Sequence, residues 1–121
     1  MYGLRILIVE DEYIVAEELR RMLEATGAAV IGPVPSVPRA QAHLESETAI
    51  DGAVLDVNLA GENVFPLADA LAERGVPFVF LTGYDRSTIP ERFATTPVVE
   101  KPLDMRTLGS ALARIVPAEP S

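Results

Sequence analysis

The chain has 121 residues, of which 49% are hydrophobic and none is cysteine, so it suits one domain with one core and excludes disulfide or thiol chemistry. Its net charge of −8 argues against a nucleic-acid partner, which needs a basic surface, and favours cations or basic partners. The first residues lack a signal-peptide pattern, and no apolar run approaches the roughly 20 residues of a membrane span. We therefore expect a cytoplasmic protein that binds neither a membrane nor nucleic acid.

Apolar runs of strand length alternate with helical patterns along the chain, which predicts strand–helix–strand units around a parallel sheet. The first strand is expected at residues 4–9, and the helix after it ends near Gly27. A second strand is expected at 28–34, followed by a helix that begins at Ser36. The inward-facing residues of these helices have helical spacing: Val15, Leu19, Met22 and Leu23 in the first, and Val37, Ala40 and Leu44 in the second.

The alternation continues in the second half of the chain. Strands are expected at 52–56, at 77–81 and at about 97–99. The helix after the first of these stops at Gly75, and the helix after the last is capped by Asp104. The inward-facing residues of these two helices are again spaced as in a helix: Val64, Leu67, Ala68 and Leu71, and then Leu108, Leu112 and Ile115.

The segment 85–94 has the weakest pattern of the chain. Pro90 permits at most a short helix there, and few apolar residues are available to anchor it, so we expect it to be loosely held. Residues 117–121 are expected to form a short tail, and residues 1–116 a single domain without internal repeats.

Polar side chains follow four of the predicted strands at the point where each strand ends. Glu10 and Asp11 follow the first strand, Asp56 closes the third, Thr82 follows the fourth and Lys101 follows the fifth. Open α/β sheets build their sites at the carboxyl ends of the strands, so a parallel sheet brings these residues to one edge. Lys101 is the only lysine of the chain, although a preference for arginine would also leave one lysine there by chance.

This set of side chains suits phosphoryl transfer with a divalent cation. Glu10, Asp11 and Asp56 repel one another when they are close, and Mg²⁺ relieves that repulsion because it prefers hard oxygen ligands. Such a site brings a phosphoryl group to Asp56, and carboxylates are established nucleophiles for phosphoryl groups. Thr82 offers a hydroxyl and Lys101 a positive charge to the other phosphoryl oxygens.

Each of these residues also has a simpler explanation when it is taken alone. Glu10 and Asp11 suit the positive end of the first helix, and Asp56 and Thr82 suit turns. Their joint placement at successive strand ends is what favours a site. Glu62, in contrast, is interpreted as an acid at a helix N-terminus rather than as a ligand.

The residues quoted above resemble the receiver domain of two-component response regulators over about residues 4–116. The matching positions are Val9-Glu10-Asp11-Glu12, Asp56, Asn58, Thr82 and Lys101-Pro102. The resemblance implies that Asp56 accepts the phosphoryl group, and that Thr82 and Lys101 are its catalytic and switch partners. It also implies four magnesium ligands, which are Glu10, Asp11, Asp56 and the backbone carbonyl of Asn58.

The same resemblance implies a fold and a function. The fold is the α/β, doubly wound (βα)₅ flavodoxin-like receiver fold, with a parallel five-stranded sheet in the order 2-1-3-4-5. The function is that of a single-domain response regulator, which receives its phosphoryl group from a histidine kinase or a His-phosphotransfer protein. Such a protein signals by a conformational change that alters partner binding, and it catalyses only its own phosphorylation and dephosphorylation.

A narrower resemblance is to the FAT GUY receivers, through the stretch Phe80-Leu81-Thr82-Gly83-Tyr84. Typical receivers carry an aromatic residue three positions before the lysine, where this chain has Val98. The resemblance therefore implies a switch formed by Thr82, Gly83 and Tyr84, with Tyr84 as the substitute aromatic residue, and a mobile fourth helix. Receivers of this type often occur alone or attached to kinases of the HWE/HisKA2 type.

Two other classes of protein fit parts of the pattern. An Asp-nucleophile phosphohydrolase needs a second acid two residues after the nucleophile, and Asn58 is an amide that cannot supply a proton. That class also needs a substrate cap, which a chain of 121 residues has little room for. A receiver fragment of a larger hybrid kinase has the same motifs as a stand-alone receiver, and this alternative stays open.

Overall fold

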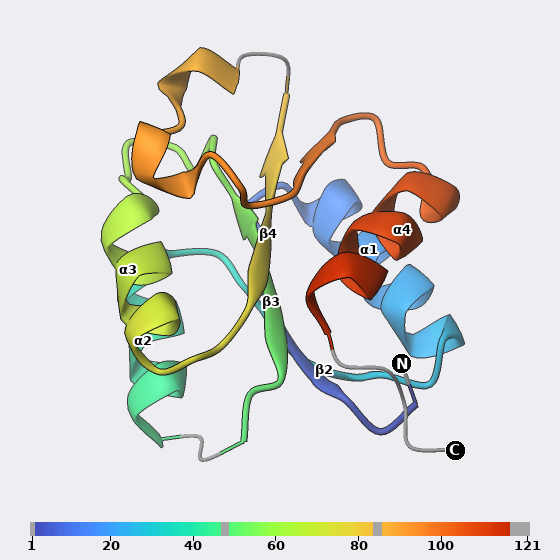
Figure 1. The fold of residues 1–121 in the computed structure, drawn as a ribbon. Coiled ribbons are helices and arrows are strands. Elements are labelled where there is room, and N and C mark those ends of the chain that lie inside the picture. The colour runs from blue at the N-terminus through green and yellow to red at the C-terminus, as the bar shows by residue number, and fades with distance from the viewer. Residues whose placement is uncertain (1, 47–48, 84–85, 117–121) are drawn as a thin grey trace.

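The computed structural model describes residues 2–46, 49–83 and 86–116, which form a twisted parallel sheet with helices on both faces (Figure 1). The five strands are hydrogen-bonded in the order β2-β1-β3-β4-β5, and all neighbouring pairs are parallel. The predicted doubly wound sheet and its strand order are therefore confirmed. The strands are β1 Arg5–Val9, β2 Ala29–Val34, β3 Gly52–Asp56, β4 Phe78–Thr82 and β5 Val98–Glu100.

Every strand lies within one residue of its predicted position at each end. All residues of β3 and β4 are buried, as expected for central strands covered on both faces. The small differences matter at one place: the sequence places Thr82 just after a strand, whereas the structure makes it the last residue of β4. Thr82 is consequently held in the sheet by its pairing with Glu100 of β5.

The helices divide between the two faces of the sheet, with α1 and α4 on one side and α2 and α3 on the other (Figure 1). Because strand side chains alternate, Ile6 and Ile8 pack in the core under α1 and α4, whereas Leu7 and Val9 pack under α2 and α3. None of the described helices is long and apolar enough to cross a membrane. The α-helices of the described residues are α1 Tyr13–Ala25, α2 Val37–Ser46, α3 Phe65–Glu73 and α4 Met105–Ile115.

The predicted helix ends are confirmed by backbone geometry. Gly27 and Gly75 follow the ends of α1 and α3 with φ of 90° and 72°, a left-handed conformation that glycine adopts without steric cost. The Asp104 carboxylate accepts a hydrogen bond of 2.8 Å from the backbone N–H of Arg106, so it caps α4 as expected.

The segment between β4 and β5 differs from the five-helix pattern that the family resemblance implies. Within the described residues it contains two short 3₁₀ turns, η1 Arg86–Thr88 and η2 Glu91–Phe93, and no α-helix. Pro90 separates the two turns, because it lacks an N–H donor and adopts an extended conformation with ψ of 149°. The expectation of a fourth helix is wrong for this part of the chain, while the limit that Pro90 sets on helix length is confirmed.

The same segment has a stronger apolar anchor than the sequence suggested. Phe93 of η2 is buried and completes a cluster of the four phenylalanines of the chain, with ring centroids 5.3 Å from Phe80, 5.9 Å from Phe65 and 6.0 Å from Phe78. Arg92 adds a bidentate ion pair with Asp69 of α3, at 3.0 Å for each nitrogen–oxygen contact. Few apolar residues anchor the described part of 85–94, as expected, but Phe93 is buried and ties the segment to α3 and β4.

Phe93→Ala tests this anchor. Truncation leaves a cavity in the phenylalanine cluster, and we expect the free energy of unfolding to fall by about 3–5 kcal/mol. Urea denaturation followed by circular dichroism measures the change. Thr95→Ala, at an exposed position close by, is the control and should change stability by less than about 0.5 kcal/mol. Equal stability of the two variants would contradict the anchoring role.

Candidate functional site

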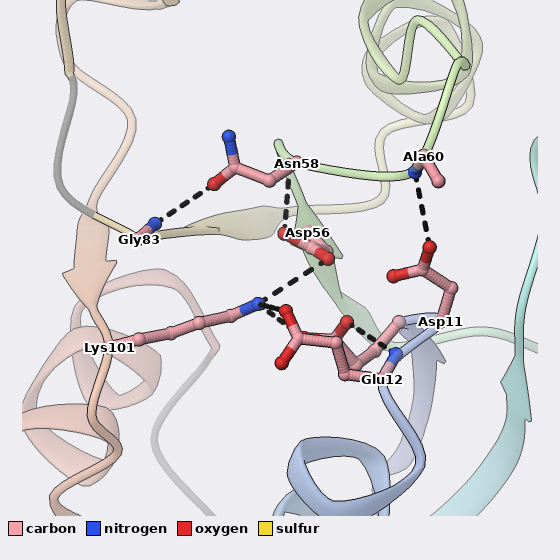
Figure 2. A network of polar contacts seen from close by, with 8 residues as sticks. Asp11, Glu12, Asp56, Asn58, Ala60, Gly83 and Lys101 are labelled. Carbon is pink, nitrogen blue, oxygen red and sulfur yellow. Dashed lines mark hydrogen bonds and ion pairs between the residues drawn. The ribbon is translucent and has the colours of Figure 1, made fainter.

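The carboxyl ends of β1, β3, β4 and β5 bring the predicted polar residues together at one edge of the sheet (Figure 2). Asp56 ends β3 and Thr82 ends β4, while Glu10 and Lys101 directly follow β1 and β5. The side chains of Glu10, Asp56 and Thr82 are almost completely buried, with exposed fractions of 2%, 0% and 0%. Three polar side chains buried at one edge of an otherwise apolar core mark this edge as the candidate site.

The three carboxylates form one acidic cluster. Ligand oxygens of Glu10, Asp11 and Asp56 all lie within 4.8 Å of one another. Burial, together with the hydrogen bond and the negative charge of nearby Asp56, raises the pKa of Glu10 to about 8. At neutral pH Glu10 therefore keeps its proton more readily than an exposed glutamate, and a cation bound in the cluster would favour the ionised form of Glu10.

Backbone N–H groups hold one oxygen of each carboxylate. Glu10 Oε2 accepts from Glu12 N at 3.1 Å, Asp56 Oδ1 accepts from Asn58 N at 2.8 Å, and Asp11 Oδ2 accepts from Ala60 N at 3.1 Å. The other oxygens, Glu10 Oε1 and Asp56 Oδ2, are buried and accept no backbone hydrogen bond, and their charged neighbour is Lys101 Nζ. These bonds orient the carboxylates and leave one oxygen of Glu10 and one of Asp56 available to a ligand.

Lys101 supplies positive charge to this cluster (Figure 2). Its Nζ lies 3.0 Å from Glu10 Oε1, 3.0 Å from Glu12 Oε1 and 3.5 Å from Asp56 Oδ2. Burial lowers the pKa of Lys101, but hydrogen bonds to Glu10 and Glu12 and the charge of Asp56 outweigh it, so the pKa is raised. Lys101 therefore stays charged at neutral pH and can interact with an anion near Asp56.

Glu12 is a site neighbour to which sequence reasoning gave no role. It was part of the quoted acidic stretch, but only the fold shows that it shares Lys101 with Glu10. The side chain of Glu12 is exposed, so solvent screens the Lys101–Glu12 ion pair and makes it weaker than the Lys101–Glu10 pair. One feature of the sequence points to this contact: Glu12 is a third acid directly after Glu10 and Asp11, and the chain has a single lysine to balance them.

Thr82 and Gly83 lie at the carboxyl end of β4. Thr82 Oγ1 is buried and has no hydrogen-bond partner, although the Thr82 carbonyl accepts from Lys101 N at 2.8 Å. Gly83 N donates to the side-chain Oδ1 of Asn58 at 2.9 Å (Figure 2). Tyr84, the third predicted switch residue, lies outside the described residues.

Glu62 lies at a helix N-terminus, as the sequence predicts. Its Oε1 accepts from Val37 N at 2.8 Å, at the first residue of α2. The carboxylate thus ties the loop after β3 to the start of α2.

The open parallel sheet and the acidic cluster at its strand ends define a CheY-like receiver fold. Residues 6–113 match the response regulator receiver domain family, and the chain belongs to that family. Receiver domains are phosphoacceptor signalling domains that obtain the phosphoryl group from histidine kinases or phosphotransfer proteins and bind Mg²⁺ at an acidic pocket.

Similarity to individual proteins agrees with this assignment. The chain is 38% identical over 81 residues to the aerobic respiration control protein ArcA of Escherichia coli K12, covering 66% of this chain and 33% of ArcA. It is 34% identical over 86 residues to the sensory transduction protein LytT of Bacillus cereus, covering 69% of this chain and 35% of LytT. The chain spans about a third of the length of these curated relatives.

Solved structures extend the similarity to almost the whole chain. The solution structure of SdrG from Sphingomonas melonis Fr1 is 43% identical, has a TM-score of 0.84, and is matched over 93% of this chain and 96% of SdrG. The BeF₃-activated conformation of SdrG matches with a TM-score of 0.78 over 93% and 97% of the two chains.

The acidic cluster fits Mg²⁺ by its chemistry. All candidate donors are oxygens, two of them buried without a directed hydrogen bond, and hard cations prefer such ligands. Glu10, Asp11 and Asp56 are the residues that would hold the ion. The Asn58 backbone lies next to them because its N–H is bound to Asp56 Oδ1.

The pKa of Glu10 predicts a pH dependence for the metal-free protein. The folded state binds the Glu10 proton more tightly than the unfolded chain, whose glutamate has a pKa near 4.5. The contribution of Glu10 to stability is therefore complete below about pH 4.5 and is lost as the pH rises towards 8. In chelator, the free energy of unfolding should fall less between about pH 5 and pH 8 in Glu10→Gln than in the wild type.

Urea denaturation at the two pH values measures this difference. Glu45→Gln changes an exposed glutamate of α2 in the same way and should keep the pH dependence of the wild type. If the free energy of unfolding of Glu10→Gln fell between the two pH values as much as that of the wild type, the Glu10 proton would not be bound more tightly in the folded state.

Proposed function

We propose that this protein is a single-domain response regulator that accepts a phosphoryl group on Asp56 in a Mg²⁺-dependent reaction. The observation that carries the proposal is the position of Asp56 Oδ2, which is fully buried, lacks a directed hydrogen bond and lies 3.5 Å from Lys101 Nζ. The proposed donor is the phosphohistidine of a histidine kinase or a His-phosphotransfer protein. The signal is a conformational change that alters partner binding in the cytoplasm.

In the proposed reaction, Asp56 Oδ2 attacks phosphorus and forms a new oxygen–phosphorus bond. The bond between phosphorus and the donor imidazole nitrogen breaks, and its electron pair returns to the imidazole ring. Lys101, which is positively charged, stabilises the negative oxygens of the phosphoryl group, and the unpartnered Thr82 hydroxyl donates to one of them. Bound Mg²⁺ supplies further positive charge for these oxygens, and Glu10, Asp11, Asp56 and the Asn58 carbonyl are its proposed ligands.

The alternative of an Asp-nucleophile phosphohydrolase has less support. The residue two positions after Asp56 is Asn58, and its side-chain amide is engaged with the Gly83 backbone. An amide carries no proton that it can give to a leaving group at neutral pH. The described residues form one sheet and its covering helices, without a second domain over the site.

The subtype and the switch are also proposals. Similarity to SdrG over nearly the full length of both chains supports a receiver that acts without an attached output domain, although a receiver fragment of a hybrid kinase has the same site. We assign the chain to the FAT GUY receivers, with Thr82, Gly83 and Tyr84 as the switch and a kinase of the HWE/HisKA2 type as its partner. The presence of Val98, rather than an aromatic residue, on β5 supports this assignment.

Asp56→Asn tests the phosphoacceptor directly. Incubation with acetyl phosphate and Mg²⁺ should add the mass of one phosphoryl group to the wild type and none to Asp56→Asn, because an amide is a poor nucleophile. Intact-protein mass spectrometry measures the adduct. The matched control is Asp51→Asn, because Asp51 lies at the opposite end of β3 and accepts a hydrogen bond from Arg5 N. A phosphoryl adduct on Asp56→Asn at the wild-type level would refute the assignment.

The metal proposal predicts a stability increase with Mg²⁺. An ion that binds only the folded protein stabilises it by about 1.4–2.7 kcal/mol at 10 to 100 times its dissociation constant. Asp11→Asn removes one charged ligand and should require a higher Mg²⁺ concentration for the same rise in melting temperature. Asp104→Asn, at the N-cap of α4, is the control and should keep the wild-type response to Mg²⁺. The proposal fails if millimolar Mg²⁺ leaves the wild-type melting temperature unchanged.

A further inference from the structure

Asn58 connects Asp56 to the end of β4 by two hydrogen bonds that run in opposite directions (Figure 2). Its backbone N–H donates to Asp56 Oδ1 at 2.8 Å, and its side-chain Oδ1 accepts from Gly83 N at 2.9 Å. The side-chain bond joins loops that are 25 positions apart in the sequence. A polar side chain thus holds the backbone donor that directly follows Thr82.

We propose that the Asn58 side chain is a positioning residue that holds the Gly83 N–H in the unphosphorylated protein and competes with the phosphoryl group for this donor. The inference rests on the proposed phosphorylation of Asp56 and concerns a separate feature, the side chain of Asn58 rather than its backbone carbonyl. Its consequence is that Asn58 favours the unphosphorylated state and weakens binding of the phosphoryl group or its mimics.

The competition follows from the donors that surround Asp56. Asp56 Oδ2 carries no directed hydrogen bond, and Thr82 Oγ1 has no partner, so both are available to a phosphoryl group without breaking a bond. The Gly83 N–H follows Thr82 along the chain, but it is already bonded to Asn58 Oδ1. A phosphoryl group brings negative charge and three acceptor oxygens, and hydrogen bonds to charged acceptors are roughly twice as strong as neutral ones. The phosphoryl group therefore draws this donor away from Asn58.

Steric contacts do not fix Gly83 in its observed position. Its φ lies outside the left-handed region, and a Cβ built on it would meet only Asn58 Oδ1, at 3.6 Å, which is an ordinary contact. The hydrogen bond to Asn58 is therefore a specific restraint on the backbone after Thr82. Once that bond is lost, Gly83 can rotate towards Asp56 at low conformational cost.

Asn58→Ala separates the side chain from the rest of the site. It keeps the backbone N–H that donates to Asp56 Oδ1 and the carbonyl that is a proposed magnesium ligand, and it removes only the competing acceptor. The chain offers a matched control in Asn63, whose Oδ1 accepts from Phe65 N at 3.0 Å in the same loop. Asn63→Ala removes an equivalent side-chain acceptor that does not touch Gly83.

The experiment is a titration of the full chain with beryllofluoride at saturating Mg²⁺, followed by amide NMR spectra of wild type, Asn58→Ala and Asn63→Ala. We expect Asn58→Ala to bind beryllofluoride roughly 2- to 10-fold more tightly than the wild type, the range that corresponds to one net hydrogen bond. Before addition of beryllofluoride, the Gly83 amide proton of Asn58→Ala should move upfield, which reports loss of its hydrogen bond. Asn63→Ala should match the wild type in both measurements, and the Mg²⁺ affinity of each protein is measured separately so that every titration is run at saturation.

The outcomes separate this inference from the proposed function. If the wild type shows no Asp56-dependent change with beryllofluoride, the proposed function fails, and with it the competition. If the wild type binds beryllofluoride and Asn58→Ala binds equally or more weakly, the competition alone is refuted. An upfield Gly83 shift without tighter binding would reduce Asn58 to a structural role and would also overturn the inference.

Discussion

The burial of Glu10 and Asp56 at the same end of neighbouring strands is the interaction on which the rest of the site depends. Two carboxylates in an apolar environment destabilise the folded chain unless positive charge or protons compensate them. Lys101 compensates part of this charge, and the raised pKa of Glu10 shows that a proton compensates another part. The site is therefore built to gain from a cation, and its charge balance changes when a phosphoryl group is added to Asp56.

Strand order explains why these residues meet. β1 and β3 are neighbours in the sheet and Val9 pairs with Leu55, so Glu10, directly after β1, and Asp56, the last residue of β3, lie at the same level. β4 and β5 extend the same edge and bring Thr82 and Lys101 to the other side of Asp56. A register shift of one residue would move Asp56 to the opposite face of the sheet, so the pairing register of β3 also fixes the site.

Most of the fold and the main site residues follow from the sequence because they depend on short-range patterns. Alternating apolar runs locate the strands, and a polar residue at the end of each run locates the site edge, as with Asp56 and Thr82. The missed features depend on contacts between distant segments. The helix that Glu62 serves, α2, lies 25 positions earlier in the chain, and Glu12 shares Lys101 with Glu10. Neither pairing leaves a local pattern in the sequence.

The segment after β4 is a second place where contacts between distant residues could not be predicted from the sequence. It also connects to the site through a packing contact. Pro90 correctly limits helix length, but the anchoring of Phe93 by three other phenylalanines requires knowledge of the packing. Phe80 lies two residues before Thr82 on β4, and its ring contacts Phe93 with centroids 5.3 Å apart. A displacement of the end of β4 therefore acts on η2 through one aromatic contact, and not only through the chain that joins them. Because η2 is a single short 3₁₀ turn, it has fewer internal hydrogen bonds than a helix to resist such a displacement, and the phenylalanine cluster and the exposed Arg92–Asp69 pair hold it in place.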